Sequence, residues 1–188
     1  MAKICEYYFA PQSPWAYLGH ARLIALAKQY DVQIDMKPID LAKLFSVSGG
    51  LPLAKRPPQR QAYRLVELKR WSAHLGLPLN LQPKFSPASG DAASKLIIAT
   101  KFAHGTDAAL QLTGAIMHAF WADDKNIMDS DTLAGLANDA GYDGAALVKA
   151  SETTSVQNEY DQFTNDAMAA SVFLSLIHIS EPTRLRRI

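Results

Sequence analysis

The sequence predicts an α/β protein that begins with a strand–helix–strand unit and is helical over most of the remaining chain. Residues 3–9 are rich in aromatic and branched side chains, which favour a strand. Pro14 suits the first turn of a helix over residues 14–29, whose apolar face can cover a sheet. Residues 32–36 alternate apolar and polar side chains before Pro38, which predicts a second strand. Two strands joined by one helix pack in parallel through a right-handed crossover.

Apolar periodicity and capping residues predict a series of helices after the second strand. A short helix or turn at residues 40–45 leads into an irregular loop, residues 46–58, which is basic and rich in glycine and proline as binding loops often are. Residues 77–87 are expected to be extended. The longer helices are expected at residues 60–74, 91–104, 107–122, 130–140, 143–150 and 155–173.

The helix at residues 60–74 is amphipathic, with apolar positions that include Tyr63, Val66 and Trp71. Trp71 is expected to pack in the core rather than to line a site. Gly76 is expected to end this helix.

The predicted elements divide the chain into four segments. Residues 1–40 form the strand–helix–strand unit, and residues 41–154 form a helical insertion. Residues 155–173 form a helix that returns to the first unit. Residues 174–188 resemble translated cloning sequence, and we exclude them from the fold prediction.

The composition is that of a globular protein, with 48% hydrophobic and 20% charged residues among 188. The formal net charge is only +1, and the cations are interspersed with acids, which argues against a nucleic-acid partner. The N-terminus has no apolar signal region and no run is long enough to cross a bilayer, so the expected location is the cytoplasm. The single cysteine, Cys5, excludes an internal disulfide and is expected to be a buried structural thiol.

Ser13 is expected near the N-cap of the first helix. Its hydroxyl, the free backbone N–H groups of the first turn and the positive end of the helix dipole converge on one place. An anion such as a thiolate is favoured there. The alternative is that Ser13 only caps the helix.

Four separated blocks of the chain resemble the 2-hydroxychromene-2-carboxylate isomerases and their kappa-class glutathione transferase relatives. The blocks read FAPQSPWAYL at residues 9–18, GGLPLAKRPP at 49–58, YRLVELKRW at 63–71 and GLPL at 76–79. The likeness extends over residues 4–173. It implies the DsbA-like branch of the thioredoxin fold and a homodimer.

The likeness ends at Phe173. Members of this family continue there with a segment containing a cis proline, then a β-hairpin and a final helix. The chain has no such pattern, so the resemblance implies a C-terminally truncated member in which the second half of the sheet is missing. With two strands left, we expect an open sheet edge that lowers solubility, and poor or absent activity of this chain.

The resemblance also implies a chemistry for the start of the first helix. Redox members of this fold carry Cys-Pro-x-Cys there, whereas this chain has Ser13 and Ala16 in the cysteine positions, so disulfide exchange at this place is excluded. The resemblance implies that glutathione is the cofactor and supplies the sulfur. Its thiolate would add to the conjugated double bond of an aromatic 2-oxo acid, which rotates before elimination. Ser13 is expected to position and activate the thiolate, with Pro14 beside it in the cofactor site.

Five further residues are candidates for ligand binding. Lys55, Arg56 and Arg60 are candidate partners for the carboxylates of glutathione or substrate, with a solvated basic loop as the alternative. Trp15 and Tyr17 are candidates for the aromatic substrate pocket, with core packing as the alternative.

No metal site is expected, because the helical histidines His20, His74, His104 and His118 lack ligand spacing. His20 is not expected to be catalytic. Two other functions stay open: a kappa-like glutathione transferase, and a binding module that holds glutathione without chemistry.

Overall fold

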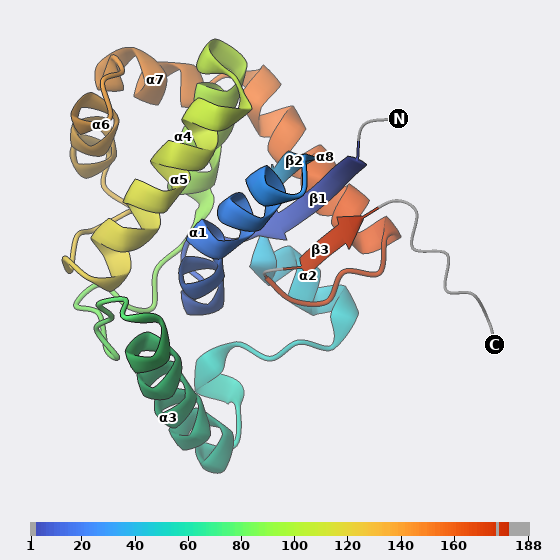
Figure 1. Cartoon of the computed structure of the whole chain (residues 1–188), viewed down its shortest axis with the longest axis vertical. Coiled ribbons are helices and arrows are strands. Elements are labelled where there is room, and N and C mark those ends of the chain that lie inside the picture. The colour runs from blue at the N-terminus through green and yellow to red at the C-terminus, as the bar shows by residue number, and fades with distance from the viewer. Residues whose placement is uncertain (1–2, 176, 181–188) are drawn as a thin grey trace.

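The computed structural model describes residues 3–175 and 177–180 (Figure 1). The elements, in chain order, are β1 (Lys3–Phe9), α1 (Pro14–Gln29), β2 (Val32–Pro38), α2 (Leu41–Ser48), the short 3-10 helix η1 (Leu53–Lys55), α3 (Pro58–Leu75), α4 (Asp91–His104), α5 (Thr106–Trp121), α6 (Ser130–Asp139), α7 (Gly144–Ser151), α8 (Thr154–Ala169) and β3 (Ile177–Ser180). Across these residues, none of the helices combines the length and apolar character needed to cross a membrane.

The predicted strand–helix–strand unit is confirmed. β1 and β2 pair in parallel, with Lys3 opposite Val32 at one end and Phe9 opposite Pro38 at the other. Pro38 is the last residue of β2, and the backbone N–H of Ile39 then donates to the carbonyl of Phe9 at 2.9 Å. β1 ends at Phe9, and the chain then enters the turn that precedes α1 at Pro14.

The C-terminal tail contributes a strand that we did not expect. Residues 177–180 form β3, which pairs antiparallel with β1 and gives a three-stranded sheet in the order β2-β1-β3. The prediction of a two-stranded sheet with the tail outside it is therefore wrong for these residues. Residues 177–180 read Ile-His-Ile-Ser, and this alternation of apolar and polar residues is typical of a strand. We did not predict the strand because we had excluded the tail from the fold prediction. The rest of the tail, residues 181–188, lies outside the described residues.

The helix predicted at residues 155–173 is shorter than expected. α8 ends at Ala169, where Ser171 adopts a left-handed backbone with φ 58°. The N–H groups of Ser171 and Val172 donate back to the carbonyls of Met168 and Ala167. This is a Schellman motif, and the burial of Val172 after the turn favours it. The N-cap is Thr153 rather than Ser155.

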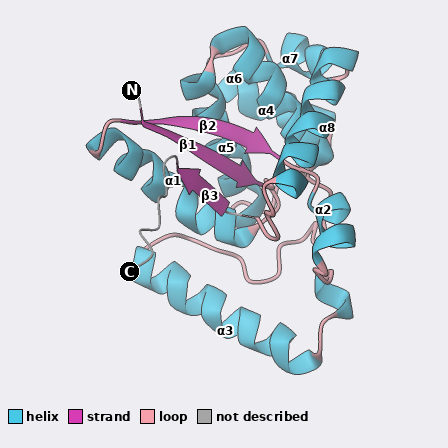
Figure 2. Cartoon of the chain, turned by 90° about the vertical axis from the view of Figure 1, so that its right-hand side faces the viewer, coloured by secondary structure: helices cyan, strands magenta, loops and turns pink. Residues whose placement is uncertain are grey.

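Helix α3 stands apart from the other helices at one end of the molecule, as both views show (Figure 1 and Figure 2). Gly76 ends it in a left-handed conformation with φ 64°, as predicted. The prediction that Trp71 packs in the core is wrong, because 41% of its surface is exposed. Tyr63 and Val66 are exposed as well, at 62% and 53%. Periodicity identified the apolar face of α3 correctly, but most of that face has no partner among the described residues.

His20 is a buried structural residue between β1 and α5. Its Nε2 lies 2.9 Å from the carbonyl of Leu110, and its Nδ1 lies 3.3 Å from the hydroxyl of Tyr7. A neutral ring satisfies both contacts when Nε2–H donates to the carbonyl and Nδ1 accepts from the hydroxyl. Burial lowers the pKa of His20.

Folding stability is therefore expected to fall in mild acid through His20. The unfolded chain takes up the proton near pH 6.5, whereas the folded chain resists it, so the stability is complete above about pH 6.5 and is lost progressively below it. Urea unfolding of the wild type and of His20→Gln at about pH 7.5 and about pH 5.5 measures this effect. The variant should show a smaller loss between the two pH values. Equal losses in both proteins would refute the assignment.

Candidate functional site

Ser13 caps α1, as the sequence predicts. Its backbone is extended, with φ −80° and ψ 124°, and its Oγ accepts a hydrogen bond from the N–H of Ala16 at 3.4 Å. Pro14 occupies the first turn, where its missing N–H costs nothing. The N–H of Ser13 donates to the carbonyl of Ala10 at 2.9 Å and closes a tight turn between β1 and α1. Ser13 and Pro14 thus lie at the positive end of a 16-residue helix.

The corner around Ser13 is closely packed. Only 6% of the surface of Ser13 is exposed, and Pro14 is also buried. The segment that follows α8 lies against this corner, since the N–H of Ala10 donates to Oγ of Ser175 at 2.9 Å. Little of the surface of Ser13 is therefore accessible at this corner.

The two aromatic candidates differ in position. Trp15 is half-buried and packs against the edge of the core. Tyr17 is buried, and its hydroxyl donates to the carbonyl of Pro78 at 2.8 Å while its ring meets His118 edge to face. Burial raises the pKa of Tyr17, and the charge of Asp123 adds to the effect. Tyr17 thus ties α1 to the segment after α3.

The three basic candidates also differ. Lys55 and Arg60 are exposed, whereas Arg56 is half-buried. The Nε of Arg56 donates to the carbonyl of Leu51 at 2.8 Å, and Gln61 donates to the carbonyl of Arg56 at 2.8 Å. Within residues 3–175 and 177–180, none of the three cations pairs with a carboxylate.

The sequence matches the DSBA-like thioredoxin domain over residues 4–173. The chain belongs to this family. A 2-hydroxychromene-2-carboxylate isomerase of Sphingobium xenophagum is 28% identical over 174 residues, which cover 92% of this chain and 86% of the relative.

Two solved structures resemble this DsbA-like domain in fold. A 2-hydroxychromene-2-carboxylate isomerase aligns with a TM-score of 0.73 and 24% identity, over 94% of this chain and 84% of that one. The cytosolic disulfide reductase DsbM from Pseudomonas aeruginosa with GSH aligns with a TM-score of 0.70 and 12% identity, over 93% of this chain and 84% of that one. At these identities the two structures establish the fold.

Disulfide chemistry is not available to this DsbA-like domain at the start of α1. Ser13 and Ala16 carry no sulfur, and Cys5, the single cysteine of the chain, is buried in β1 as predicted. Burial raises the pKa of the Cys5 thiol, and the charge of Glu6 adds to the effect, so its reactive thiolate is disfavoured.

Arg64 is a half-buried cation that the sequence prediction did not single out. It projects from α3, is half-buried, and its guanidinium lies 5.9 Å from the ring centroid of the buried Trp121. Burial lowers the pKa of Arg64, and the charge of Arg56 lowers it further. The sequence could have indicated Arg64 as a further candidate cation, because Arg64 lies one helical turn after the candidate Arg60.

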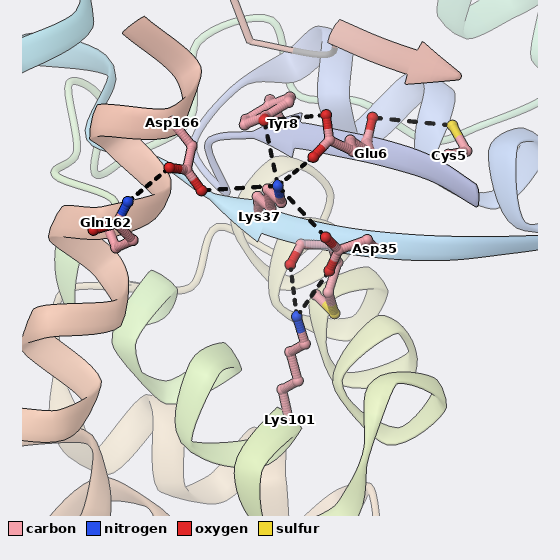
Figure 3. A network of polar contacts seen from close by, with 9 residues as sticks. Cys5, Glu6, Tyr8, Asp35, Lys37, Lys101, Gln162 and Asp166 are labelled. Atoms are coloured by element: carbon pink, nitrogen blue, oxygen red, sulfur yellow. Dashed lines mark hydrogen bonds and ion pairs between the residues drawn. The ribbon is translucent and has the colours of Figure 1, made fainter. Parts of the chain in front are cut away.

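A cluster of charges on the sheet was missed as well (Figure 3). The buried Nζ of Lys37 bonds to the carboxylate of Glu6 and lies 3.5 Å from Asp35 and 3.9 Å from Asp166. Lys101 pairs with Asp35 from the other side, at 3.1 Å. Burial acts to lower the pKa of Lys37, but the hydrogen bond to Glu6 and the other contacts outweigh it and raise this pKa. The sequence offered one sign of this cluster, because the alternation of side chains along the two paired strands places Glu6 of β1 and Lys37 of β2 on the same face of the sheet.

Metal ligands do not gather in the described part of the chain. No three His, Cys, Asp or Glu side chains there are arranged to hold an ion.

Proposed function

We propose that this DsbA-like domain catalyses the glutathione-dependent isomerisation of 2-hydroxychromene-2-carboxylate to a trans-benzylidenepyruvate-type 2-oxo acid. The observation that carries the proposal is a hydroxyl at the N-cap of α1, where redox members of the fold have a cysteine. The isomerase relative at 28% identity supports the substrate class. The DsbM structure with GSH supports the cofactor, because it records glutathione together with a protein of the same fold.

Ser13 supplies a hydrogen-bond donor for a sulfur anion. Because its Oγ already accepts from the N–H of Ala16, its hydroxyl proton remains to be donated outward. A hydrogen bond to a charged group contributes about 1.5–3 kcal/mol, and the helix dipole about 0.3–1 kcal/mol. Together they lower the pKa of a bound thiol from about 8.5 to about 7. A large fraction of the bound glutathione is then thiolate at neutral pH.

The thiolate acts as a temporary nucleophile. When bound, glutathione would supply a thiolate that adds to the conjugated carbon of the ring-opened cis 2-oxo acid, lets the former double bond rotate as a single bond and leaves again as the trans double bond is restored, so that atoms and electrons balance with no net change in glutathione. Ser13, at the N-cap of α1, would hold this sulfur ionised.

The test is turnover with and without the thiol. Because β3 pairs with the edge of β1 that the sequence prediction left open, we now expect the purified protein to convert 2-hydroxychromene-2-carboxylate to the trans product with glutathione, and to lose nearly all of this activity without it. S-methylglutathione is the matched control, since it keeps the peptide but has no thiol. Activity that continues without glutathione, or that S-methylglutathione supports, would refute the proposal. Glutathione binding without turnover would favour a binding module instead.

A further inference from the structure

The guanidinium of Arg64 is partly withdrawn from water. Among the described residues it pairs with no carboxylate, and it lies over the ring of Trp121 at 5.9 Å from the centroid. An acid is within reach in sequence, because Glu67 follows one turn later on α3. Glu67 instead pairs with Arg70 at 2.8 Å. Arg64 therefore has no carboxylate partner within residues 3–175 and 177–180.

A second cation, Arg56, is held at the start of α3. Gln61, one turn before Arg64, donates to the carbonyl of Arg56 at 2.8 Å, and the Nε of Arg56 donates to the carbonyl of Leu51 at 2.8 Å. The charge of Arg56 also lowers the pKa of Arg64. Two half-buried guanidinium groups with the same charge repel one another. A carboxylate that binds to both would offset this repulsion. A planar carboxylate suits this place, because a guanidinium binds it through two parallel hydrogen bonds.

The pair belongs to the same region as the start of α1. Trp121, under Arg64, accepts a hydrogen bond through its carbonyl from the N–H of Asn80 at 2.6 Å. Two residues earlier, Pro78 accepts from the hydroxyl of Tyr17, one turn beyond Ser13 on α1. Figure 1 shows the N-terminal end of α1 directed toward α3.

We propose that Arg64, with Arg56, forms a carboxylate-binding pair that anchors a ligand at the Ser13 site. This inference rests on the proposed function, which supplies two candidate carboxylates, the glycine carboxylate of glutathione and the carboxylate of the aromatic 2-oxo acid. In this arrangement the ring of Trp121 stabilises the Arg64 guanidinium that lies over it. Arg64 is then a binding residue for an anionic end of the ligand, away from the reacting carbons.

Calorimetric binding to the full chain tests the pair and identifies the carboxylate. The probes are glutathione, its glycine ethyl ester, trans-benzylidenepyruvate and its methyl ester. Arg64→Gln is expected to weaken binding of one of the two acids by about tenfold or more, while its ester binds as it does to the wild type. The acid that is weakened identifies the source of the carboxylate. Lys69→Gln, which removes an exposed cation from the same helix, should change neither affinity.

Arg64→Lys tests whether the loss of binding in Arg64→Gln is purely structural. It keeps the charge and most of the stem, so it is expected to fold like the wild type and to bind the selected acid with intermediate affinity. Equal binding of both acids by wild type and Arg64→Gln would overturn the inference. So would a loss that affects acid and ester alike, or a wild type that does not prefer either acid to its ester. These measurements need no turnover, so a protein without isomerase activity that still shows the Arg64-dependent preference would contradict the proposed function alone.

Discussion

Replacing Ser13 with alanine is expected to lower glutathione-dependent turnover by about 10- to 100-fold. The change removes the hydroxyl that we propose to donate to the sulfur, and a hydrogen bond to a charged group is worth about 1.5–3 kcal/mol. The backbone N–H groups and the dipole of α1 remain, so some activity should survive. The loss is expected in kcat as well as in kcat/KM, because the hydroxyl acts on the reacting sulfur.

The same substitution also removes a helix cap, and this has to be separated from catalysis. Loss of an N-cap costs about 1 kcal/mol of folding stability. Asp143→Ala is the matched control, since Asp143 caps α7 through the N–H of Ala146. Figure 1 shows α7 far from the start of α1. Both variants should lose similar stability, and only Ser13→Ala should lose turnover. Equal activity of the two variants would leave Ser13 as a cap and nothing more.

Replacing Lys37 with methionine is expected to cost about 2–3 kcal/mol of unfolding free energy at neutral pH. Lys37 is the buried cation among the carboxylates of Glu6, Asp35 and Asp166 (Figure 3). Methionine fills the space of the stem but leaves the carboxylates to repel one another. The cost stays below that of a fully buried pair, because each carboxylate side chain is about one-third exposed.

The pH dependence of that loss identifies its cause. Carboxyl groups ordinarily titrate near pH 4, so acid should remove the repulsion and bring the variant closer to the wild type. Urea unfolding at neutral pH and near pH 4 measures the difference. Lys28→Met, which removes an exposed lysine of α1, serves as the control and should change stability little. A Lys37→Met protein as stable as this control would show that the cluster does not support the fold.

The parts of the fold that local chemistry determines were predictable from the sequence. The bounds of β1, α1 and α4 agree with prediction, because proline, glycine and capping residues mark where these elements begin and end. The end of α8 was missed because a serine, rather than a glycine, takes the left-handed position after it. The exposure of Trp71 was missed because periodicity identifies an apolar face without indicating whether another element covers it.

The residues of the candidate site also divide into those that local sequence predicts and those that it does not. The capping position of Ser13 depends on its immediate neighbours in the chain, and the structure confirms it. Arg64 and Lys37 depend on contacts with residues distant in sequence, Trp121 for one and Glu6 for the other. A single sequence does not reveal such contacts. The division of the chain at residues 40, 154 and 173 remains a prediction.

Ultraviolet titration of the glutathione thiolate bound to the wild type and to Ser13→Ala measures the proposed effect of Ser13 on the sulfur. We expect the thiol bound to the wild type to titrate with a pKa about 1–2 below that of free glutathione. In Ser13→Ala the pKa should return most of the way to the free value. A thiol whose pKa is the same when free, bound to the wild type and bound to the variant would contradict the proposal that the Ser13 hydroxyl stabilises the sulfur anion.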